Sequence, residues 1–115
     1  MSHTLRSKDL RIDRQAAQLA AAYLKLPAQA QARHRFYDGT VAEGTLVSLP
    51  GWQRPIVIQE NGEVIYDNMQ GHWGNILELE KFVGYTLAQM AEEPLESLIV
   101  EKTPEGLKLY NTVGG

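Results

Sequence analysis

The amino-acid sequence predicts a single α+β domain, in which two helices pack on a mainly antiparallel sheet. Two segments, at about residues 13–26 and 75–93, have apolar residues at helical spacing. The other segments are rich in β-branched and aromatic residues and are separated by turn dipeptides. The chain has 115 residues, which is the size of one domain. We therefore expect residues 1–115 to form one domain of two layers.

The first helix is predicted to begin after Asp13 and to run to Leu26. Aspartate is a favourable N-cap because its side chain accepts a hydrogen bond from a free N–H group of the first turn. Pro27 is expected to end the helix. The predicted apolar face is narrow and consists of Ala16, Leu19, Ala20 and Tyr23.

Turn signals divide the next part of the chain into extended segments. Residues 27–32 show only a weak secondary-structure signal and are expected to form a connector. A short strand is expected over residues 33–37. Asp38-Gly39 then predicts a turn. Residues 40–49 are expected to be extended, and Pro50-Gly51 predicts another turn.

The clearest local signal is a β-hairpin. Residues 56–58 and 64–66 are apolar and β-branched or aromatic, and Asn61-Gly62 lies between them. This dipeptide is typical of a type I′ turn, which needs a positive φ at both central residues.

A second helix is predicted over residues 75–93. Asn75 is the expected N-cap, Glu78 is the third helical residue, and Pro94 is expected to end the helix. The predicted buried side consists of Ile76, Leu79, Phe82, Val83, Leu87 and Met90. Residues 97–103 and 107–113 should then form a final hairpin.

The composition excludes several classes of protein. The chain has no cysteine, which excludes disulfides, thiolate metal sites and cysteine nucleophiles. No stretch approaches the ~20 apolar residues of a membrane-spanning helix, and no secretory signal is recognisable at the N-terminus. We expect a cytoplasmic protein that does not enter a membrane.

The charges are unevenly distributed along the chain. Residues 1–35 contain seven basic and two acidic residues, although the whole chain has a net charge of −3. One hypothesis is weak nucleic-acid binding, which would use Arg6, Arg11, Arg33 and Arg35. The favoured interpretation is that the basic segment lies near the acidic second helix, because aromatic residues are not interleaved with these arginines.

The loop before the second helix is the first candidate for a binding site. It combines polar groups and a large aromatic side chain with a helix N-terminus, whose free N–H groups suit an anion. The candidate ligand-binding residues are Asp67, Asn68, His72, Trp73 and Asn75. The alternative is that Trp73 is a core residue and that the loop glycines serve the loop geometry.

Evidence for an enzyme is weak. Asp67 and His72 could form an acid–base pair, but no nucleophile belongs to the same motif. The histidines His3, His34 and His72 lack metal-ligand spacing, so we assign no metal, cofactor or catalytic residue. The sequence favours a protein without enzymatic activity.

Trp52 is the candidate interface residue. It follows the predicted turn at Pro50-Gly51, and an aromatic side chain at a turn can be exposed for a protein partner. The alternative is that Trp52 belongs to the core.

The chain resembles a domain-of-unknown-function family that occurs in cyanobacteria, in other bacteria and, as a conserved plastid reading frame, in algal plastids. The resemblance lies in the start Met1-Ser2-His3, the Tyr37-x-Gly39 turn, Tyr66-Asp67, Trp73-Gly74, Tyr85, Glu105-Gly106 and Leu107-x-Leu109. The resemblance implies an α+β domain of the cytoplasm or plastid stroma. It also implies an accessory or adaptor role with an AAA-type ATPase.

Three functions therefore remain open. The favoured function is that of an accessory or interaction protein, which uses the sheet or the loop before the second helix against a protein partner. The first alternative is a small-ligand or anion-binding domain, or a rudimentary enzyme, with its site at residues 67–75. The second alternative is weak nucleic-acid binding. Association of identical copies also remains open.

Overall fold

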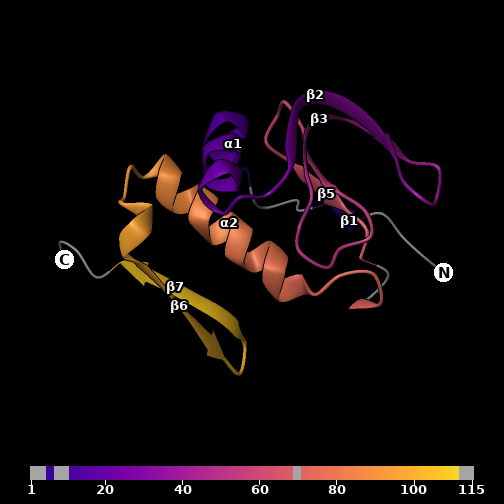
Figure 1. Cartoon of the computed structure of the whole chain (residues 1–115). Helices are drawn as coiled ribbons and strands as arrows, with labels where there is room; N and C mark the ends of the chain where they lie inside the picture. The colour runs from indigo at the N-terminus through magenta and orange to yellow at the C-terminus, as the bar shows by residue number, and fades with distance from the viewer. Residues whose placement is uncertain (1–4, 7–10, 69–70, 112–115) are drawn as a thin grey trace.

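The computed structural model describes residues 5–6, 11–68 and 71–111 (Figure 1). The elements in chain order are β1 (Leu5–Arg6), α1 (Arg14–Tyr23), β2 (Ala28–Arg35), β3 (Val41–Val47), β4 (Ile56–Ile58), β5 (Val64–Tyr66), α2 (Ile76–Met90), the 3-10 helix η2 (Leu95–Ser97), β6 (Leu98–Thr103) and β7 (Gly106–Asn111). The predicted α+β class is confirmed. No helix of the described residues is long and apolar enough to cross a membrane.

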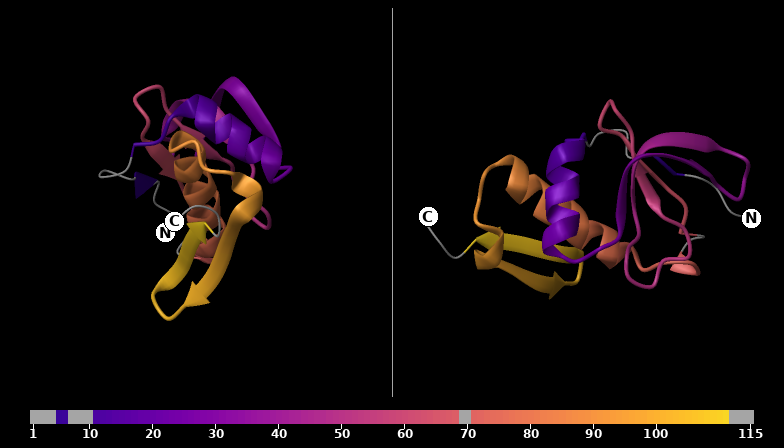
Figure 2. Two further views of the ribbon diagram at one scale, coloured as in Figure 1. Left: turned by 90° about the vertical axis from the view of Figure 1, so that its left-hand side faces the viewer. Right: turned by 45° about the horizontal axis from the view of Figure 1, so that its top comes forward.

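Five strands form one antiparallel sheet in the order β1-β5-β4-β3-β2. The last two strands, β6 and β7, pair only with each other among the described strands. Helix α2 lies between the five-stranded sheet and this C-terminal hairpin (Figures 1 and 2). The predicted final hairpin is confirmed as far as Asn111, and residues 112–113 of the predicted strand lie outside the described residues. The hairpin stands apart from the main sheet.

Helix α1 begins as predicted and ends earlier. The side chain of Asp13 accepts a hydrogen bond from the Ala16 N–H at 2.9 Å, as expected of an N-cap. The last helical residue is Tyr23 and not Leu26, because Lys25 has a positive φ of 59°. The N–H of Leu26 then bonds to the Ala21 carbonyl at 2.8 Å, the closing bond of a Schellman motif.

The buried side of α1 differs from the prediction. Its buried residues are Ala16, Ala17, Ala20 and Ala21, whereas Leu19 and Tyr23 are 49% and 46% exposed. The helix is therefore turned so that its alanines pack against α2 and the sheet, and small side chains allow that close approach. The ring of Tyr23 instead stacks on Tyr85 of α2, with centroids 5.8 Å apart.

Residues 27–32 do not form the predicted connector. Strand β2 begins at Ala28 and pairs with β3 from Ala28↔Val47 to Arg35↔Val41, with an irregularity between Gln29 and Ala32. The following turn is at Asp38-Gly39 as predicted. The Gly39 N–H bonds to the Phe36 carbonyl, and Gly39 has a φ of 93°.

The β4–β5 hairpin is confirmed, but its turn is not type I′. The Gly62 N–H bonds to the Gln59 carbonyl at 2.9 Å, so Glu60 and Asn61 are the central residues. Gly62 has a φ of 90°, and Asn61 is not among the residues with positive φ. This pattern is the three-residue hairpin loop that ends in a left-handed glycine.

Helix α2 is capped as predicted and ends at Met90, not at residue 93. The Asn75 side chain accepts from the Leu77 N–H at 2.9 Å. Glu92 has a φ of 59°, and the Glu93 N–H bonds to the Ala88 carbonyl. Both helices therefore end in a Schellman motif that contains one residue with a positive φ.

The buried side of α2 is also only partly the predicted one. Leu79 and Phe82 are buried, but Ile76, Leu87 and Met90 are 41%, 41% and 44% exposed. The buried residues that the prediction left out are Tyr85, Thr86 and Ala88. They are buried because α2 is covered on several sides.

Two apolar clusters hold the fold together. The first joins both helices to the sheet and includes Phe82, Ile56, Ile58 and Val47. The second consists of Phe36, Ala42, Val57 and Ile65, with Leu46 packed against it. Since neighbouring strand residues point to opposite faces, the two clusters lie on the two faces of the sheet.

Candidate functional site

The loop after β5 is built mainly from its own hydrogen bonds. Asp67 is 1% exposed and Asn68 is 6% exposed. The Asn68 side chain donates to the Gly74 carbonyl at 3.3 Å, and the Asn68 carbonyl accepts from the N–H groups of Gly71 and Trp73. The polar groups of Asn68 are thus used to shape the loop.

Trp52 joins this loop from the segment before β4. Its indole N–H donates to the Asn75 carbonyl at 3.0 Å. A Cβ on Gly74 would lie 2.6 Å from ring atoms of Trp52, so only glycine fits below the ring. The Gln53 N–H also bonds to the Trp73 carbonyl at 2.9 Å. The two tryptophan segments are therefore fixed against each other.

Tyr37, at the tip of the β2–β3 hairpin, reaches the same loop. Its ring meets Trp73 edge to face, with centroids 5.6 Å apart, although Tyr37 is 67% exposed. Trp73 is partly exposed. The contact joins residues that are 36 positions apart in the sequence, and it presents two aromatic rings to the solvent from ordered backbone.

Arg54 follows Gln53, whose N–H bonds to the Trp73 carbonyl, and it lies near His34 of β2. The His34 ring packs on Phe36 at 4.6 Å, and its buried Nε2 atom has no hydrogen-bond partner among the described residues. Burial, and then the positive charge of Arg54, lower the pKa of His34 below its usual 6.5. Arg35 is the last residue of β2 and precedes Tyr37 by two positions. We call Arg35, Tyr37, Arg54 and Trp73, which belong to the segments that meet at the Tyr37–Trp73 contact, the hairpin-end surface.

The lowered pKa of His34 makes stability depend on pH. The unfolded chain takes up this proton near pH 6.5, whereas the folded chain takes it up only at lower pH. The contribution is therefore fully present above pH 6.5 and is lost as the pH falls through the folded-state pKa. We expect the melting temperature to decrease less in His34→Gln than in the wild type when the pH is lowered from about 7.5 to 5.

Arg54→Gln is the matched variant for this pH experiment. It should reduce the pH dependence without removing it, because burial contributes more than Arg54 to the lowered pKa. Equal losses of melting temperature in the wild type and in His34→Gln would contradict this account.

The structure brings together some of the predicted site residues and separates others. Trp52, Asn68, Trp73 and Asn75 meet through the contacts described above. His72 is exposed, whereas Asp67 is enclosed and has an interaction partner of its own. The proposed acid–base pairing of Asp67 with His72 thus has no contact to support it, and the loop as a ligand site stays a prediction.

Two of the arginines in the nucleic-acid hypothesis have carboxylate partners. Arg11 pairs with Glu63 at 3.5 Å, and Arg33 pairs with Glu43 at 3.0 Å. The side chain of Arg6 lies outside the described part of the structure. Within the described residues, no group of three or more His, Asp or Glu side chains could hold a metal ion.

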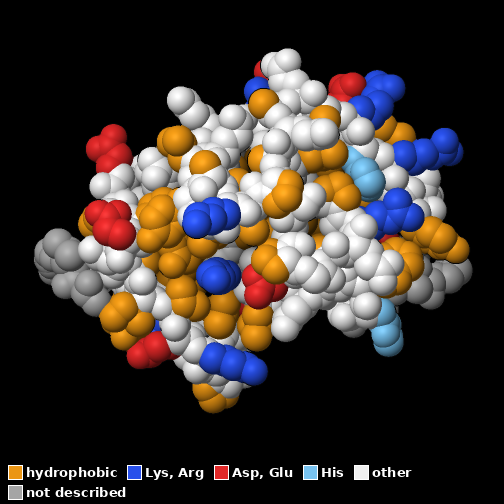
Figure 3. Space-filling view, in the orientation of Figure 1, with side chains coloured by type: hydrophobic (Ala, Val, Ile, Leu, Met, Phe, Trp, Pro, Cys, Tyr) orange, Lys and Arg blue, Asp and Glu red, His pale blue; other side chains and the backbone are white. Residues whose placement is uncertain are grey.

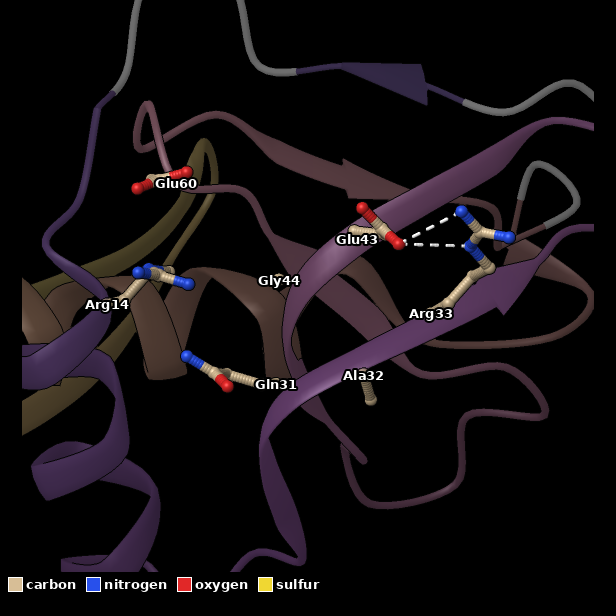
Figure 4. Close-up of a pocket in the computed structure, with 7 residues that line it drawn as sticks. All are labelled: Arg14, Gln31, Ala32, Arg33, Glu43, Gly44 and Glu60. Carbon is tan, nitrogen blue, oxygen red and sulfur yellow. Dashed lines mark hydrogen bonds and ion pairs between the residues drawn. The ribbon is translucent and has the colours of Figure 1, made fainter.

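A polar hollow of about 460 Å³ was not predicted (Figure 4). Its lining comes from α1, β2, β3 and the β4–β5 turn: Arg14, Gln31, Ala32, Arg33, Glu43, Gly44 and Glu60. No spacing in the sequence could have indicated it, since four separate segments contribute. The ion pair of Arg33 with Glu43 forms one side of this open hollow (Figure 4).

Comparison with protein-family models, with curated proteins and with solved structures gives no match to this chain.

Proposed function

We propose that this domain is an accessory protein that binds a protein partner, and that the hairpin-end surface is where the partner docks. The observation that carries the proposal is the Tyr37–Trp73 pair, in which a 67% exposed tyrosine is held against a tryptophan. Exposed Tyr, Trp and Arg side chains are enriched in the energetic centres of protein interfaces. The hairpin-end surface contains all three residue types.

Hydrogen bonds of the segments that carry the two rings also support the proposal. Trp73 is fixed through its carbonyl by Gln53, and the tip residue Asp38 accepts a hydrogen bond from the Thr40 N–H at 2.9 Å. A partner would therefore meet rings that are already positioned. Binding to a preorganised surface loses less conformational entropy than binding that must order the surface first.

Small-ligand binding at residues 67–75 is supported less well. The side chain of Asn68 and the cap of Asn75 already make hydrogen bonds inside the protein. Trp52 lies over Gly74 and bonds to Asn75 at the start of α2. Among the described residues of this loop, the side-chain groups of Asn68 and Asn75 are therefore already used within the protein.

The test is a comparative capture experiment from the native source, with the full chain as bait. Tyr37→Ala should lose the captured protein, because it removes one ring of the Tyr37–Trp73 pair. Tyr37 is 67% exposed, so we expect the variant to keep the fold. The control is Tyr110→Ala, which removes an exposed tyrosine from the C-terminal hairpin, at the other end of the molecule (Figure 1). An AAA-type ATPase, implied by the family resemblance, is the first candidate to look for.

The proposal is refuted if every protein retained by the wild type is also retained by Tyr37→Ala. It is equally refuted if no protein is reproducibly retained by the wild type. Circular dichroism and melting temperature of each variant establish that lost capture does not reflect unfolding.

A further inference from the structure

The charges of the folded protein are unevenly distributed. Several Lys and Arg side chains lie at the end formed by the β2–β3 hairpin, with others over the middle and lower part of the face shown, and Asp and Glu side chains are prominent at the opposite end (Figure 3). The exposed acidic residues beyond α2 are Glu92, Glu93, Glu96, Glu101 and Glu105. The net charge of −3 therefore conceals one end that would attract an acidic partner.

Arg35 and Arg54 supply this attraction. Arg35 is exposed on β2, and Arg54 is partly exposed in the segment before β4. Neither guanidinium makes an ion pair or hydrogen bond with the residues that the structure describes. Arg33 differs, because Glu43 neutralises it. Two guanidinium groups without an ion pair among the described residues thus belong to the segments that carry the Tyr37–Trp73 pair. Arg35 precedes Tyr37 by two residues, and Arg54 follows Gln53, whose N–H bonds to the Trp73 carbonyl.

The positive charge of Arg54 also affects His34. This charge acts on the neighbouring imidazole and disfavours its protonation. The guanidinium is therefore close to a partly buried ring, and it makes no ion pair with a carboxylate of the described residues. A carboxylate from outside the chain would supply the balancing charge.

We propose that the partner docks through an acidic peptide segment, whose carboxylates bind Arg35 and Arg54 while its apolar side chains contact Tyr37 and Trp73. The proposal rests on the proposed function and adds the chemistry of the partner. Arginine is well suited to this role because its planar guanidinium binds a carboxylate through two parallel hydrogen bonds.

A nucleic acid is a less suitable occupant than an acidic peptide. Strand binding without sequence preference uses a basic groove with a series of stacking rings. Here two guanidinium groups and one ring pair are available, and Glu43 adds a carboxylate close to Arg33. The acidic residues elsewhere on the chain would also oppose a long polyanion.

The experiment measures binding of a labelled short peptide of alternating Glu and Leu to the full chain by fluorescence anisotropy. The comparison probes are a Lys-Leu peptide of equal length and a labelled oligothymidylate. We expect the Glu-Leu peptide to bind with an affinity that falls as salt rises, whereas any binding of the Lys-Leu peptide to the acidic end should not change in Arg35→Gln/Arg54→Gln. The double variant Arg35→Gln/Arg54→Gln should weaken Glu-Leu binding about tenfold.

The matched control is Lys25→Gln/Lys102→Gln, which removes the same charge from exposed residues elsewhere. It should change the affinity for the Glu-Leu peptide less than about twofold. Equal weakening in both double variants would overturn the proposal, because the attraction would then come from the net charge of the protein and not from Arg35 and Arg54. Tighter binding of the oligothymidylate than of the Glu-Leu peptide would overturn it in favour of a nucleic acid.

The capture experiment separates this inference from the proposed function. If Tyr37→Ala loses the partner and Arg35→Gln/Arg54→Gln retains it, the proposed docking surface is supported and the proposed acidic peptide segment is refuted. If both variants retain the partner, both proposals fall.

Discussion

Gly44→Ala is expected to reduce the free energy of unfolding by about 3 kcal/mol or more. Gly44 is buried in the middle of β3, and a Cβ there would collide with the carbonyl oxygen of Ile58. It would also lie 2.9 Å from the Ile58 carbonyl carbon and 3.0 Å from the Gln59 Cα. These are backbone atoms of the neighbouring strand, so no side chain can rotate away. The two strands would have to separate.

The matched control for this prediction is Gly39→Ala. Gly39 also has a positive φ, of 93°, but a Cβ there meets nothing within 4 Å. Its replacement should cost only the backbone strain, which is about 1 kcal/mol for alanine in this region. Urea unfolding of both variants isolates the cost of the collision. Equal losses of stability would show that β3 and β4 are not as close as described.

The local turn signals of the sequence predicted the hairpins well, because a turn is formed by residues that are neighbours in the chain. Asp38-Gly39 and Asn61-Gly62 both mark hairpin loops. In both loops the glycine has a positive φ, and the preceding Asp or Asn side chain accepts from the residue after the glycine. The exact turn type was missed because the same dipeptide serves the two-residue and the three-residue loop.

The buried sides of the helices were predicted less well. Apolar periodicity identifies a helix, but it does not state which neighbours cover it. Leu87 was expected inside and is 41% exposed, whereas Thr86 is fully buried and donates to the Phe82 carbonyl at 2.9 Å. Such a threonine satisfies its hydroxyl within the helix, so it can be buried at little cost.

The first part of strand β2, residues 28–32, was missed for a similar reason, whereas the predicted strand over residues 33–37 overlaps its end. Its first residues alternate alanine and glutamine, which have little intrinsic preference for strands. They are extended because β3 supplies the hydrogen-bonding partner, from Ala28↔Val47 onward. This pairing spans 19 positions of the sequence, and no local pattern indicates it.

The candidate site was likewise predicted only where neighbouring residues in the sequence indicate it. The loop before α2 and Trp52 were each recognised as unusual from local residues, and the structure joins them at Asn75. The contact of Tyr37 with Trp73 and the proximity of Arg54 to His34 depend on the sheet and could not be predicted. The function proposed here rests on these long-range contacts.

Phe82→Ala should reduce the free energy of unfolding by about 3–5 kcal/mol. Phe82 is 1% exposed in the first apolar cluster, where α1, α2 and the sheet meet. Its removal leaves a cavity that the surrounding alanines of α1 are too small to fill. A domain of this size has roughly 5–15 kcal/mol of stability, so the variant should be only marginally folded at physiological temperature.

Leu87→Ala is the control on the same helix. Leu87 is 41% exposed, so its truncation should cost less than about 1 kcal/mol, although a prediction from periodicity alone would place it in the core. Thermal and urea unfolding of the two variants therefore compare the two accounts of α2. A greater loss of stability in Leu87→Ala than in Phe82→Ala would mean that α2 is rotated about its axis. The positions of Gly84 against Leu109 and of Tyr85 against Tyr23 would then have to change with it.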